Sequence, residues 1–350
     1  MISTIVFERQ TDEDSYAPLR CIMKRFGKRG NLSPKEFYWA VNDAYHTAES
    51  AVYDTVHSDM FLEIEPIWSR LLNHVKKSQQ KLSILDIGSG TGLVGQFLNK
   101  LIPDRVGLLI MLDPNEAMLD KSKIKSQNWA FPCKFIKGDL TSIVPLDISV
   151  DIVTLNSVMH HIVEIESFCA LIPSILNHGG LLLQAQDPRE GMRDDPVFIE
   201  RRQTMRVLRV HPDKSRVYLF LRAISGKLIR LLTRNYFRLH PLAWATSQPL
   251  LKQGVIRKPM DIASIWAVTD FHVPDLPGNI GHGLNLSALK KQLDGMLLID
   301  FFTYHFYDLP WTEFSEKEKQ AEIALFIEND PHGAIFGSAW EKIGGELDIS

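Results

Sequence analysis

The sequence predicts an α/β fold: a doubly wound, mainly parallel seven-stranded sheet with N-terminal helices and a large helical insertion after strand five. Two observations lead to this prediction. Between residues 82 and 188, runs rich in Ile, Leu and Val alternate with stretches of helical spacing, which is the pattern of βαβ units. The first run ends in an aspartate and three glycines at alternate positions, within KLSILDIGSGTGLVGQFLNK at 81–100.

Five strands are expected in the alternating region, each apolar enough to be covered on both faces. They are residues 82–88, 106–114, 133–139, 150–157 and 179–188. Helical spacing is found at 91–102, 115–127 and 164–180, and the last of these helices is expected to end at a Gly-Gly pair. Two closing strands are expected at 295–309 and 333–343, with a helix at 315–330 between them.

These elements divide the chain into four segments. Residues 1–80 form an N-terminal helical lid, in which Ser33 caps a helix that begins with Pro34. The Rossmann-like core with the glycine loop spans 81–190. It is followed at 191–290 by a mostly helical insertion, which is expected to cap the acceptor cleft. The closing strands of the core lie in 291–350.

Composition favours a cytoplasmic protein whose fold does not depend on disulfide bonds or a structural metal. The 350 residues suffice for a full hydrophobic core, and Cys21, Cys133 and Cys169 lie far apart without C-x-x-C spacing. We therefore expect neither a disulfide framework nor a structural zinc site. The first twenty residues do not resemble a secretory signal, and no run of 18 uncharged apolar residues indicates a transmembrane span.

The glycine loop is expected to bind a ligand. Glycines after a first strand let the chain turn tightly and let a ligand approach the main chain. The stretch from Gly90 to Gly95 matches the dinucleotide expression Gly-x-Gly-x-x-Gly, but the strand already ends at Gly88, so that match falls into the helix. Asp86 places a negative charge where a pyrophosphate would lie, which favours a cationic ligand group.

The residues 82–188 resemble the class I S-adenosylmethionine-dependent methyltransferases, whose first motif commonly reads as a hydrophobic strand followed by D/E-x-G-x-G-x-G. The resemblance implies the class I methyltransferase fold, S-adenosylmethionine as the cofactor, and a small-molecule type of acceptor. In that family the loop wraps the methionine portion of the cofactor. By position, Asp86, Gly88, Ser89 and Gly90 are therefore expected to contact it.

Further cofactor contacts follow from the next two strands. Asp113 matches the acid that takes both ribose hydroxyls in the family, and a carboxylate can accept from two donors. Asn115 begins the following helix, on which Met118 lies. Asp139 matches the position that accepts from the adenine amino group, with Leu140 beside the ring; a Gly-Asp pair after a strand is also a common turn.

The end of strand four is expected to supply both a cofactor contact and the catalytic candidates. Asn156 and Ser157 face the crevice at the carboxyl ends of the parallel strands. His160 and His161 follow and are placed where a general base could reach an acceptor, although a packed or hydrogen-bonded histidine is the alternative interpretation. We expect no metal, because adjacent helical side chains diverge by about 100°.

The N-terminal segment carries a stripe of aromatic and titratable residues. Tyr45, His46, Glu49, Tyr53 and His57 are spaced so that a helix aligns several of them on one face. Such a stripe is typical of a lid and equally of ordinary packing. Related enzymes often cover the methionine end of the cofactor with N-terminal helices, so Tyr45 and Tyr53 are the candidates for that cover.

The insertion is strongly basic. Residues 201–258 hold fourteen Lys or Arg and a single acid, Asp213, in a chain whose net charge is -3. The favoured interpretation is a cap whose arginines pair with the acidic remainder of the chain. The alternatives are a peripheral membrane contact through 216–238, a docking surface for a partner, and a pocket for an anionic or lipid-like acceptor. Nothing indicates a nucleic-acid partner, since no RNA-binding module is recognisable.

The acidic stretch after strand five, QDPREGMRDDP at 186–196, is interpreted as a solvated loop rather than as a divalent-cation site.

Taken together, the sequence predicts an enzyme that transfers a methyl group from S-adenosylmethionine, by in-line displacement, to a small or medium-sized metabolite, anionic or amphiphilic, as in natural-product or quinone-like pathways. Two other classes stay open: a cofactor-binding protein with a non-methylating or regulatory role, and an NAD-dependent oxidoreductase. The acceptor, the accepting atom and the oligomeric state are not indicated by the sequence.

Overall fold

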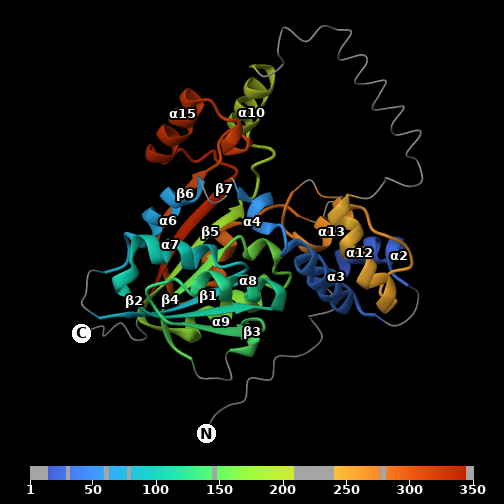
Figure 1. The fold of residues 1–350 in the computed structure, drawn as a ribbon. Coiled ribbons are helices and arrows are strands. Elements are labelled where there is room, and N and C mark those ends of the chain that lie inside the picture. The colour runs from blue at the N-terminus through green and yellow to red at the C-terminus, as the bar shows by residue number, and fades with distance from the viewer. Residues whose placement is uncertain are drawn as a thin grey trace.

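The computed structural model describes residues 15–343 except for 29–31, 59–62, 77–79, 144–147, 209–239, 275 and 277–280. Its centre is a single seven-stranded sheet, with one lobe of helices beside it and a smaller pair of helices beyond one end (Figure 1). The predicted fold class is confirmed.

The strand order is β3-β2-β1-β4-β5-β7-β6. The strands are β1 (Leu82–Ile87), β2 (Val106–Asp113), β3 (Cys133–Lys137), β4 (Val150–Asn156), β5 (Leu176–Pro188), β6 (Met296–Tyr304) and β7 (Ile335–Lys342). The first five are parallel, and β7 runs antiparallel to both β5 and β6. Because the order reverses between β1 and β4, a crevice opens at their carboxyl ends.

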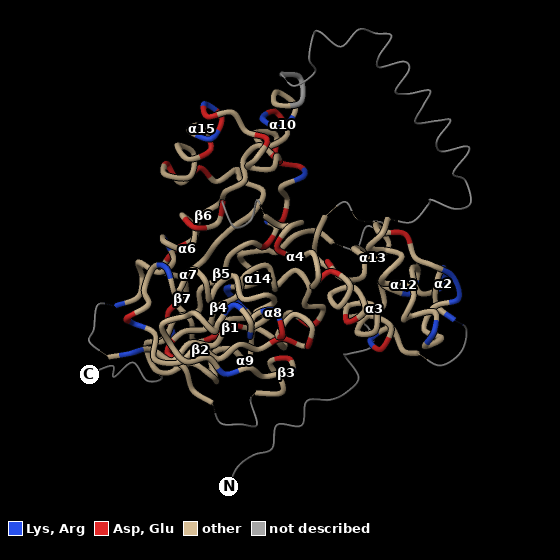
Figure 2. Tube along the Cα trace, viewed as in Figure 1, with Lys and Arg blue, Asp and Glu red and all other residues tan. Residues whose placement is uncertain are grey.

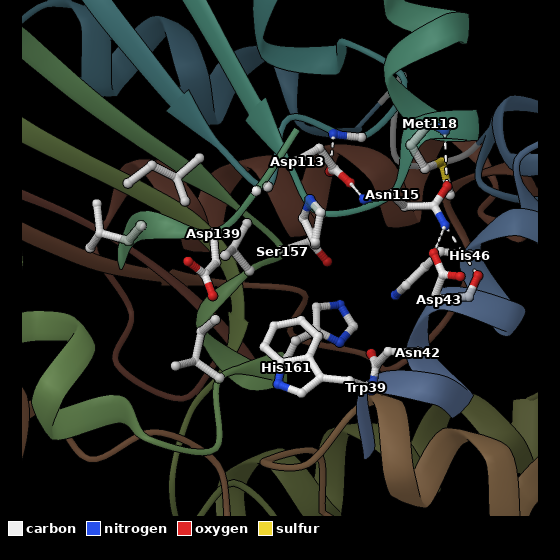
Figure 3. Close-up of a pocket in the computed structure, with 18 of the residues that line it drawn as sticks. Trp39, Asn42, Asp43, His46, Asp113, Asn115, Met118, Asp139, Ser157 and His161 are labelled. Carbon is white, nitrogen blue, oxygen red and sulfur yellow. Dashed lines mark hydrogen bonds between the residues drawn. The ribbon is translucent and has the colours of Figure 1, made fainter. Parts of the chain in front are cut away.

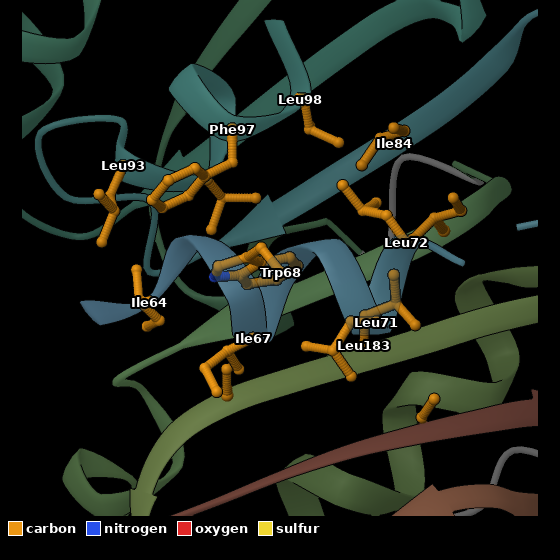
Figure 4. Packing of buried hydrophobic residues seen from close by; sticks show 14 of the residues in the cluster. Ile64, Ile67, Trp68, Leu71, Leu72, Ile84, Leu93, Phe97, Leu98 and Leu183 are labelled. Carbon is orange, nitrogen blue, oxygen red and sulfur yellow. The ribbon is translucent and has the colours of Figure 1, made fainter. Parts of the chain in front are cut away.

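One face of the sheet is covered by α6 (Glu65–Leu72) and α7 (Leu93–Leu101), with α15 (Glu316–Ile327) packing at its edge. Trp68 of α6 is completely buried in this layer, between α7 and the sheet (Figure 4). Deleting a side chain of this size from a core costs about 3–5 kcal/mol. The layer therefore anchors a helix from the N-terminal segment firmly on the sheet.

The opposite face is covered by α9 (Ile165–Ile175) and α14 (Leu286–Gln292). The Gly-Gly pair does not end α9 as predicted. The helix ends at Ile175, and β5 begins at Leu176, whose Cα pairs with Val150 of β4. Ladder pairing with β4 therefore takes over before the glycines, and Gly179, at φ +69°, lies in an irregular stretch of the strand.

A separate lobe combines two helices of the predicted N-terminal lid with two helices of the predicted insertion. It contains α2 (Arg20–Phe26), α3 (Pro34–Glu49), α12 (Pro241–Gln253) and α13 (Ile262–Thr269), which share one hydrophobic cluster (Figure 1). We call it the lid lobe. The predicted cap of α3 is present, because Ser33 and Glu36 form a reciprocal capping box.

A second pair of helices stands beyond the end of the sheet. The chain leaves β5 into α10 (Pro196–Leu208), which lies in the same region as α15 (Figure 1). Arg201 of α10 forms a bidentate pair with Asp330, at 2.9 and 2.8 Å. Charged residues of both signs are interspersed along the helices and loops of the described residues, while the strands are mostly uncharged (Figure 2). The whole basic stretch 216–238, which includes Arg222, Arg230 and Arg234, lies outside the described residues.

No helix among the described residues combines the length and the apolar character that crossing a membrane requires.

Candidate functional site

A cavity of about 440 Å³ opens at the carboxyl ends of β1, β2 and β4, beneath α3 of the lid lobe (Figure 3). Its size is in the range of small-molecule sites. A much smaller pocket adjoins it at the glycine loop, and Tyr53, Gly88, Gly90 and Asn156 line both. The site is therefore one continuous region, with the sheet as its floor and α3 as its wall.

The glycine loop adopts the conformation that its residue types allow. Gly88 and Gly90 have φ of +62° and +51°, in the left-handed region that glycine tolerates. A Cβ on Gly88 would lie 2.6 Å from Cγ2 of Val158, whereas a Cβ on Gly90 would meet only the carbonyl oxygen of Gly88 at 3.9 Å. The space beside Gly90 is therefore open, and a ligand can approach the main chain there.

Asp113 ends β2 and lines the cavity. Its two carboxylate oxygens accept the backbone N–H groups of Gly90 and Asn115, each at 2.8 Å. Burial raises the pKa of Asp113, although these two hydrogen bonds oppose the rise. Each oxygen keeps a further lone pair, so the carboxylate is oriented and still able to accept from hydroxyl donors.

Two polar atoms at the glycine loop are buried without a hydrogen-bond partner among the described residues. They are Oδ2 of Asp86 and Oγ of Ser89. The other oxygen of Asp86 accepts from Oγ1 of Thr154 at 2.7 Å, and burial raises the pKa of Asp86 to about 7. Buried polar atoms in native structures normally have partners, so these two atoms indicate a ligand with polar groups.

Asn115 and Met118 follow β2 and connect this side of the cavity to the lid lobe. Asn115 caps α8 (Glu116–Ser126), since its Oδ1 accepts from the N–H of Met118 at 3.1 Å. Its Nδ2 donates to Oδ1 of Asp43 at 3.0 Å and to Oγ1 of Thr47 at 2.8 Å. The side chain of Asn115 thus holds α3 in place, while both Asn115 and Met118 line the cavity.

Asp139 and Leu140 lie at the opposite end of the cavity, after β3. Asp139 caps a short 3-10 turn by accepting from the N–H of Ser142 at 3.3 Å, so its backbone also has the turn role that a Gly-Asp pair predicts. Leu140 is buried and offers an apolar surface. This pair fits a flat ring with an amino donor at its edge.

Asn156 is held by the helix on the other side of the sheet. Its Oδ1 accepts from Nε1 of Trp68 at 3.0 Å, which leaves its amide nitrogen free to face the pocket. Ser157 follows with φ +61° and also lines the cavity. The residues predicted at the ends of β1, β2, β3 and β4 are therefore brought together.

Only one histidine of the predicted catalytic pair faces the cavity. His161 lines it, whereas His160 is buried behind it and donates from Nδ1 to Oδ1 of Asp187 at 2.7 Å. Burial alone would lower the pKa of His160, but Asp187 and Asp270 raise it to about 9. Burial and the neighbouring His160 lower the pKa of His161 to about 4.

The two imidazoles do not diverge as predicted. They belong to a 3-10 turn, η5 (Met159–His161), and their ring centroids lie 4.0 Å apart with planes tilted by 41°. Asp270, which follows α13, draws both rings together, because its Oδ1 lies 3.5 Å from Nε2 of His160 and 3.6 Å from Nδ1 of His161. Ligand atoms of these three residues lie within 4.8 Å of one another, a spacing compatible with a metal. Both Nδ1 atoms, however, bond to protein oxygens, those of Asp187 and Thr269, and we assign the cluster as a charged His160 paired with carboxylates beside a hydrogen-bonded His161.

Of the two tyrosines predicted to cover the cofactor, Tyr53 lines both cavities and Tyr45 lines neither. Tyr45 points into the lid lobe, where its hydroxyl donates to Oε1 of Glu49 at 2.8 Å and accepts from Nε1 of Trp266 at 3.1 Å. Tyr53 stacks at 4.5 Å on His57, which itself reaches Glu49. The predicted stripe thus divides between the pocket wall and the interior of the lobe.

Sequence reasoning missed most of the wall that α3 contributes. The residues are Tyr38, Trp39, Asn42, Asp43 and His46. Their spacing of one, three and four follows a single face of the helix, so helical periodicity was the signal available. It does not distinguish a pocket wall from core packing, which is why Tyr38, Trp39, Asn42 and Asp43 were not singled out, whereas His46 belonged to the predicted stripe.

The prediction that the acidic stretch at the end of β5 is a solvated loop is wrong for Asp187 and Asp195, near the two ends of the stretch. Asp187 is completely buried and accepts from His160 and from Nε2 of Gln184. Asp195 pairs with Arg189 at 2.6 Å and with His332 at 2.9 Å. Each aspartate thus has one partner from elsewhere in the fold, His160 for Asp187 and His332 for Asp195, and no local pattern reveals these two contacts.

Comparison with known proteins agrees with this geometry. Residues 85–184 match the methyltransferase domain family. The malonyl-acyl-carrier-protein O-methyltransferase of Xylella fastidiosa is 33% identical over 100 residues, which are 29% of this chain and 33% of that protein. The ubiquinone/menaquinone biosynthesis C-methyltransferase of Wigglesworthia glossinidia brevipalpis is 33% identical over 76 residues, 22% of this chain and 30% of that protein. The solved structure of the plantazolicin methyltransferase with SAH aligns over 89% of this chain and 99% of that one, at 12% identity and a TM-score of 0.40.

The strand order, the glycine loop and the domain match define a class I methyltransferase domain. Residues 85–184 thus match the methyltransferase domain family, and the sheet around them has the strand order of the class I methyltransferase fold. The chain's match covers about a third of the length of the two curated relatives. The cofactor of this class is S-adenosylmethionine, and the residues present fit it: Asp113 can accept from hydroxyls, the space beside Gly90 is open, and Asp86 and Ser89 offer unpartnered polar atoms.

Proposed function

We propose that this protein transfers a methyl group from S-adenosylmethionine to a small or medium-sized metabolite. The observation that carries the proposal is the continuity of the cavity: Asp113, Gly90 and Asn156 line it on the cofactor side, and His161 and Trp39 line it on the side of α3. When bound, S-adenosylmethionine supplies an electrophilic methyl group on a sulfonium. An acceptor held against α3 would lie in the same cavity as that methyl group.

The cofactor contacts that we propose follow the arrangement of the site. Gly88, Ser89, Gly90 and Asp86 hold the amino acid end, with Tyr53 and Asn156 beside them. On the far side, Asp113 binds the ribose hydroxyls, and Asp139 and Leu140 hold the adenine, with Asn115 and Met118 completing the wall. Tyr45 supports this set from within the lid lobe.

For the acceptor side, we propose that His161 contacts the acceptor and that the buried His160 positions His161. The Nδ1 of His161 faces the carbonyl oxygen of Thr269 at 2.7 Å, which assigns the proton to Nδ1 and leaves Nε2 as a hydrogen-bond acceptor. Because the pKa of His161 is lowered to about 4, its ring is neutral at physiological pH and can orient an acceptor hydroxyl, amine or thiol.

The acceptor class is inferred more coarsely. The two curated relatives are, by name, a malonyl-acyl-carrier-protein O-methyltransferase and a C-methyltransferase of ubiquinone/menaquinone biosynthesis, and both names are consistent with an anionic or amphiphilic acceptor. The cavity is mostly apolar around Ile87, Val158, Ile162 and Phe168, which suits an acceptor with an apolar body. No observation here favours a non-methylating role.

Calorimetric titration with S-adenosylmethionine, S-adenosylhomocysteine and NADH tests the cofactor assignment. We expect micromolar binding of the first two ligands, loss of at least tenfold in affinity for Asp113→Ala, and no change for Asp120→Ala, an exposed aspartate on α8. Binding of NADH alone would refute the proposal. A panel of carboxylic acids, phenols, amines and thiols, monitored by S-adenosylhomocysteine release, then identifies the acceptor class.

A further inference from the structure

The two histidines that line the acceptor side come from different parts of the chain and have opposite surroundings. His161 lies on η5 and His46 on α3, and their rings meet edge to face at 5.5 Å with an interplanar angle of 89° (Figure 3). His161 is next to the protonated His160, whereas His46 is next to a carboxylate. Paired titratable groups in unlike environments are the arrangement from which acid and base roles are assigned.

The carboxylate beside His46 is Glu49, one turn further along α3. Oε2 of Glu49 lies 3.5 Å from Nδ1 of His46, so the other ring nitrogen, Nε2, is the one left for the cavity. Glu49 is only 3% exposed, yet it is well supported, because its Oε1 accepts from the hydroxyl of Tyr45 at 2.8 Å and faces Nε2 of His57 at 3.0 Å. Although burial opposes it, the histidines lower the pKa of Glu49 to about 2, so it is ionised.

Three carboxylates near His46 favour its protonated form, and a second imidazole, that of His161, is in contact with it. Glu49 is on its own helix, Asp113 ends β2, and Asp270 follows α13, while the ring of His161 from η5 touches it. Burial alone would lower the pKa of His46, but Glu49, Asp113 and Asp270 together raise it above its ordinary value. His46 is consequently the stronger base of the two histidines in the cavity.

We propose that His46, oriented by Glu49, is the catalytic residue that takes the acceptor's proton, while His161 orients the acceptor. The inference rests on the proposed function and names the proton acceptor for it. As the acceptor atom bonds to the incoming methyl group, its bond to hydrogen breaks, the electron pair stays on the acceptor atom, and the proton goes to Nε2 of His46. A carboxylate bound to a histidine in this way is the arrangement of an activated base.

A direct test follows the ring nitrogens of His46 and His161 by NMR in protein labelled at histidine, saturated with S-adenosylhomocysteine. Assignment uses His46→Asn and His161→Asn. We expect His46 to titrate above 6.5, its ordinary pKa, and His161 to stay neutral to well below it. Glu49→Gln should lower the pKa of His46 by about one unit or more, whereas His57→Asn, which removes another neighbour of Glu49, should leave it raised.

The proposal is overturned if His161 titrates above His46, or if Glu49→Gln leaves the pKa of His46 unchanged. Should Glu49→Gln fail to fold, the order of the two titrations in the unsubstituted protein still decides the matter. This measurement needs no acceptor, so it is independent of the acceptor screen, and calorimetry with S-adenosylmethionine reports separately on the cofactor site.

Turnover gives the second test once the screen has found an acceptor. Loss of a general base typically costs a factor of 10² to 10⁴. We expect His46→Ala to lose a factor in this range in kcat, with partial recovery on adding imidazole, and Glu49→Gln to move the acidic limb of the pH profile to lower pH. A full-rate His46→Ala enzyme would contradict the assignment.

Discussion

The amide nitrogen of Asn115 donates a hydrogen bond of 3.0 Å to the carboxylate of Asp43, and this contact joins the cofactor edge of the sheet to the lid lobe. Oδ1 of the same Asn115 caps α8. A single side chain therefore couples α8, the helix after Asp113, to α3, the wall of the cavity.

Replacing Asn115 by alanine should weaken both the fold and the cofactor site. Loss of an N-cap costs about 0.5–2 kcal/mol. Beyond that, α3 loses its donor to Asp43 and Thr47, and we expect affinity for S-adenosylhomocysteine to fall about tenfold, measured by calorimetry. The matched control is Asn285→Ala, which removes the N-cap of α14, a helix away from the site. In the unsubstituted protein, Oδ1 of Asn285 accepts from the N–H of Ala288 at 2.8 Å. Equal effects of both variants on affinity would show that Asn115 does not couple the two sides.

Gly88 should not tolerate alanine, for a reason beyond its backbone angle. A left-handed φ costs a non-glycine residue roughly 1–2 kcal/mol. At Gly88 the added Cβ would also lie 2.6 Å from Val158, the residue just before η5, and would displace the turn that carries His161. Gly191→Ala has a similar φ of +71° and nothing within 4 Å, so it isolates the backbone cost. We expect Gly88→Ala alone to lose cofactor binding, and similar binding by both variants would contradict this reading.

Thr154 supports the aspartate that begins the glycine loop. Thr154→Val keeps the shape of the side chain but leaves Asp86 without its donor at 2.7 Å, and an unsatisfied buried acceptor costs about 1–3 kcal/mol. We expect a lower urea midpoint and a further rise in the pKa of Asp86. Thr246→Val is the control, because that buried hydroxyl bonds only to the carbonyl oxygen of Leu242 in its own helix. A loss no larger than that of the control would mean that Asp86 does not depend on Thr154.

Stability should decrease as the pH rises from 6.5 to 9, because of His160. Its pKa is about 9 in the folded protein and 6.5 in the unfolded chain, so the folded state holds the proton more tightly. The resulting stabilisation is complete below pH 6.5 and is lost as the pH rises through 9. Urea unfolding across this range should show a steeper decline for the unsubstituted protein than for His160→Asn. Parallel declines would show that His160 is not protonated in the fold.

Much of the core could be predicted from the sequence because its signals are local. Five apolar runs, a glycine loop and an acid at the end of β2 follow one another along about a hundred residues, and parallel strands bring their carboxyl ends to one edge. Asp86, Gly88, Gly90 and Asp113 therefore converge wherever the alternation holds. The boundary of α9 was the exception, because strand pairing of Leu176 with β4 outweighed the Gly-Gly stop signal.

The roles of the histidines could not be predicted in the same way, because each role depends on partners distant in the chain. His160 is buried by Asp187 and Asp270, and His161 is kept neutral by its burial and by the charge of His160. His46 enters the cavity only because α3 docks beside α12 and α13, which lie more than 190 residues away in the sequence.

The sequence by itself determined the class of fold and the cofactor edge, since hydrophobic periodicity and glycine conformations act between near neighbours. The tertiary structure alone decided which side chains line the cavity beside α3 and which of them carry charge. Burial and the electrostatic fields of distant carboxylates set a pKa, and neither exists until the lid lobe and the sheet have come together.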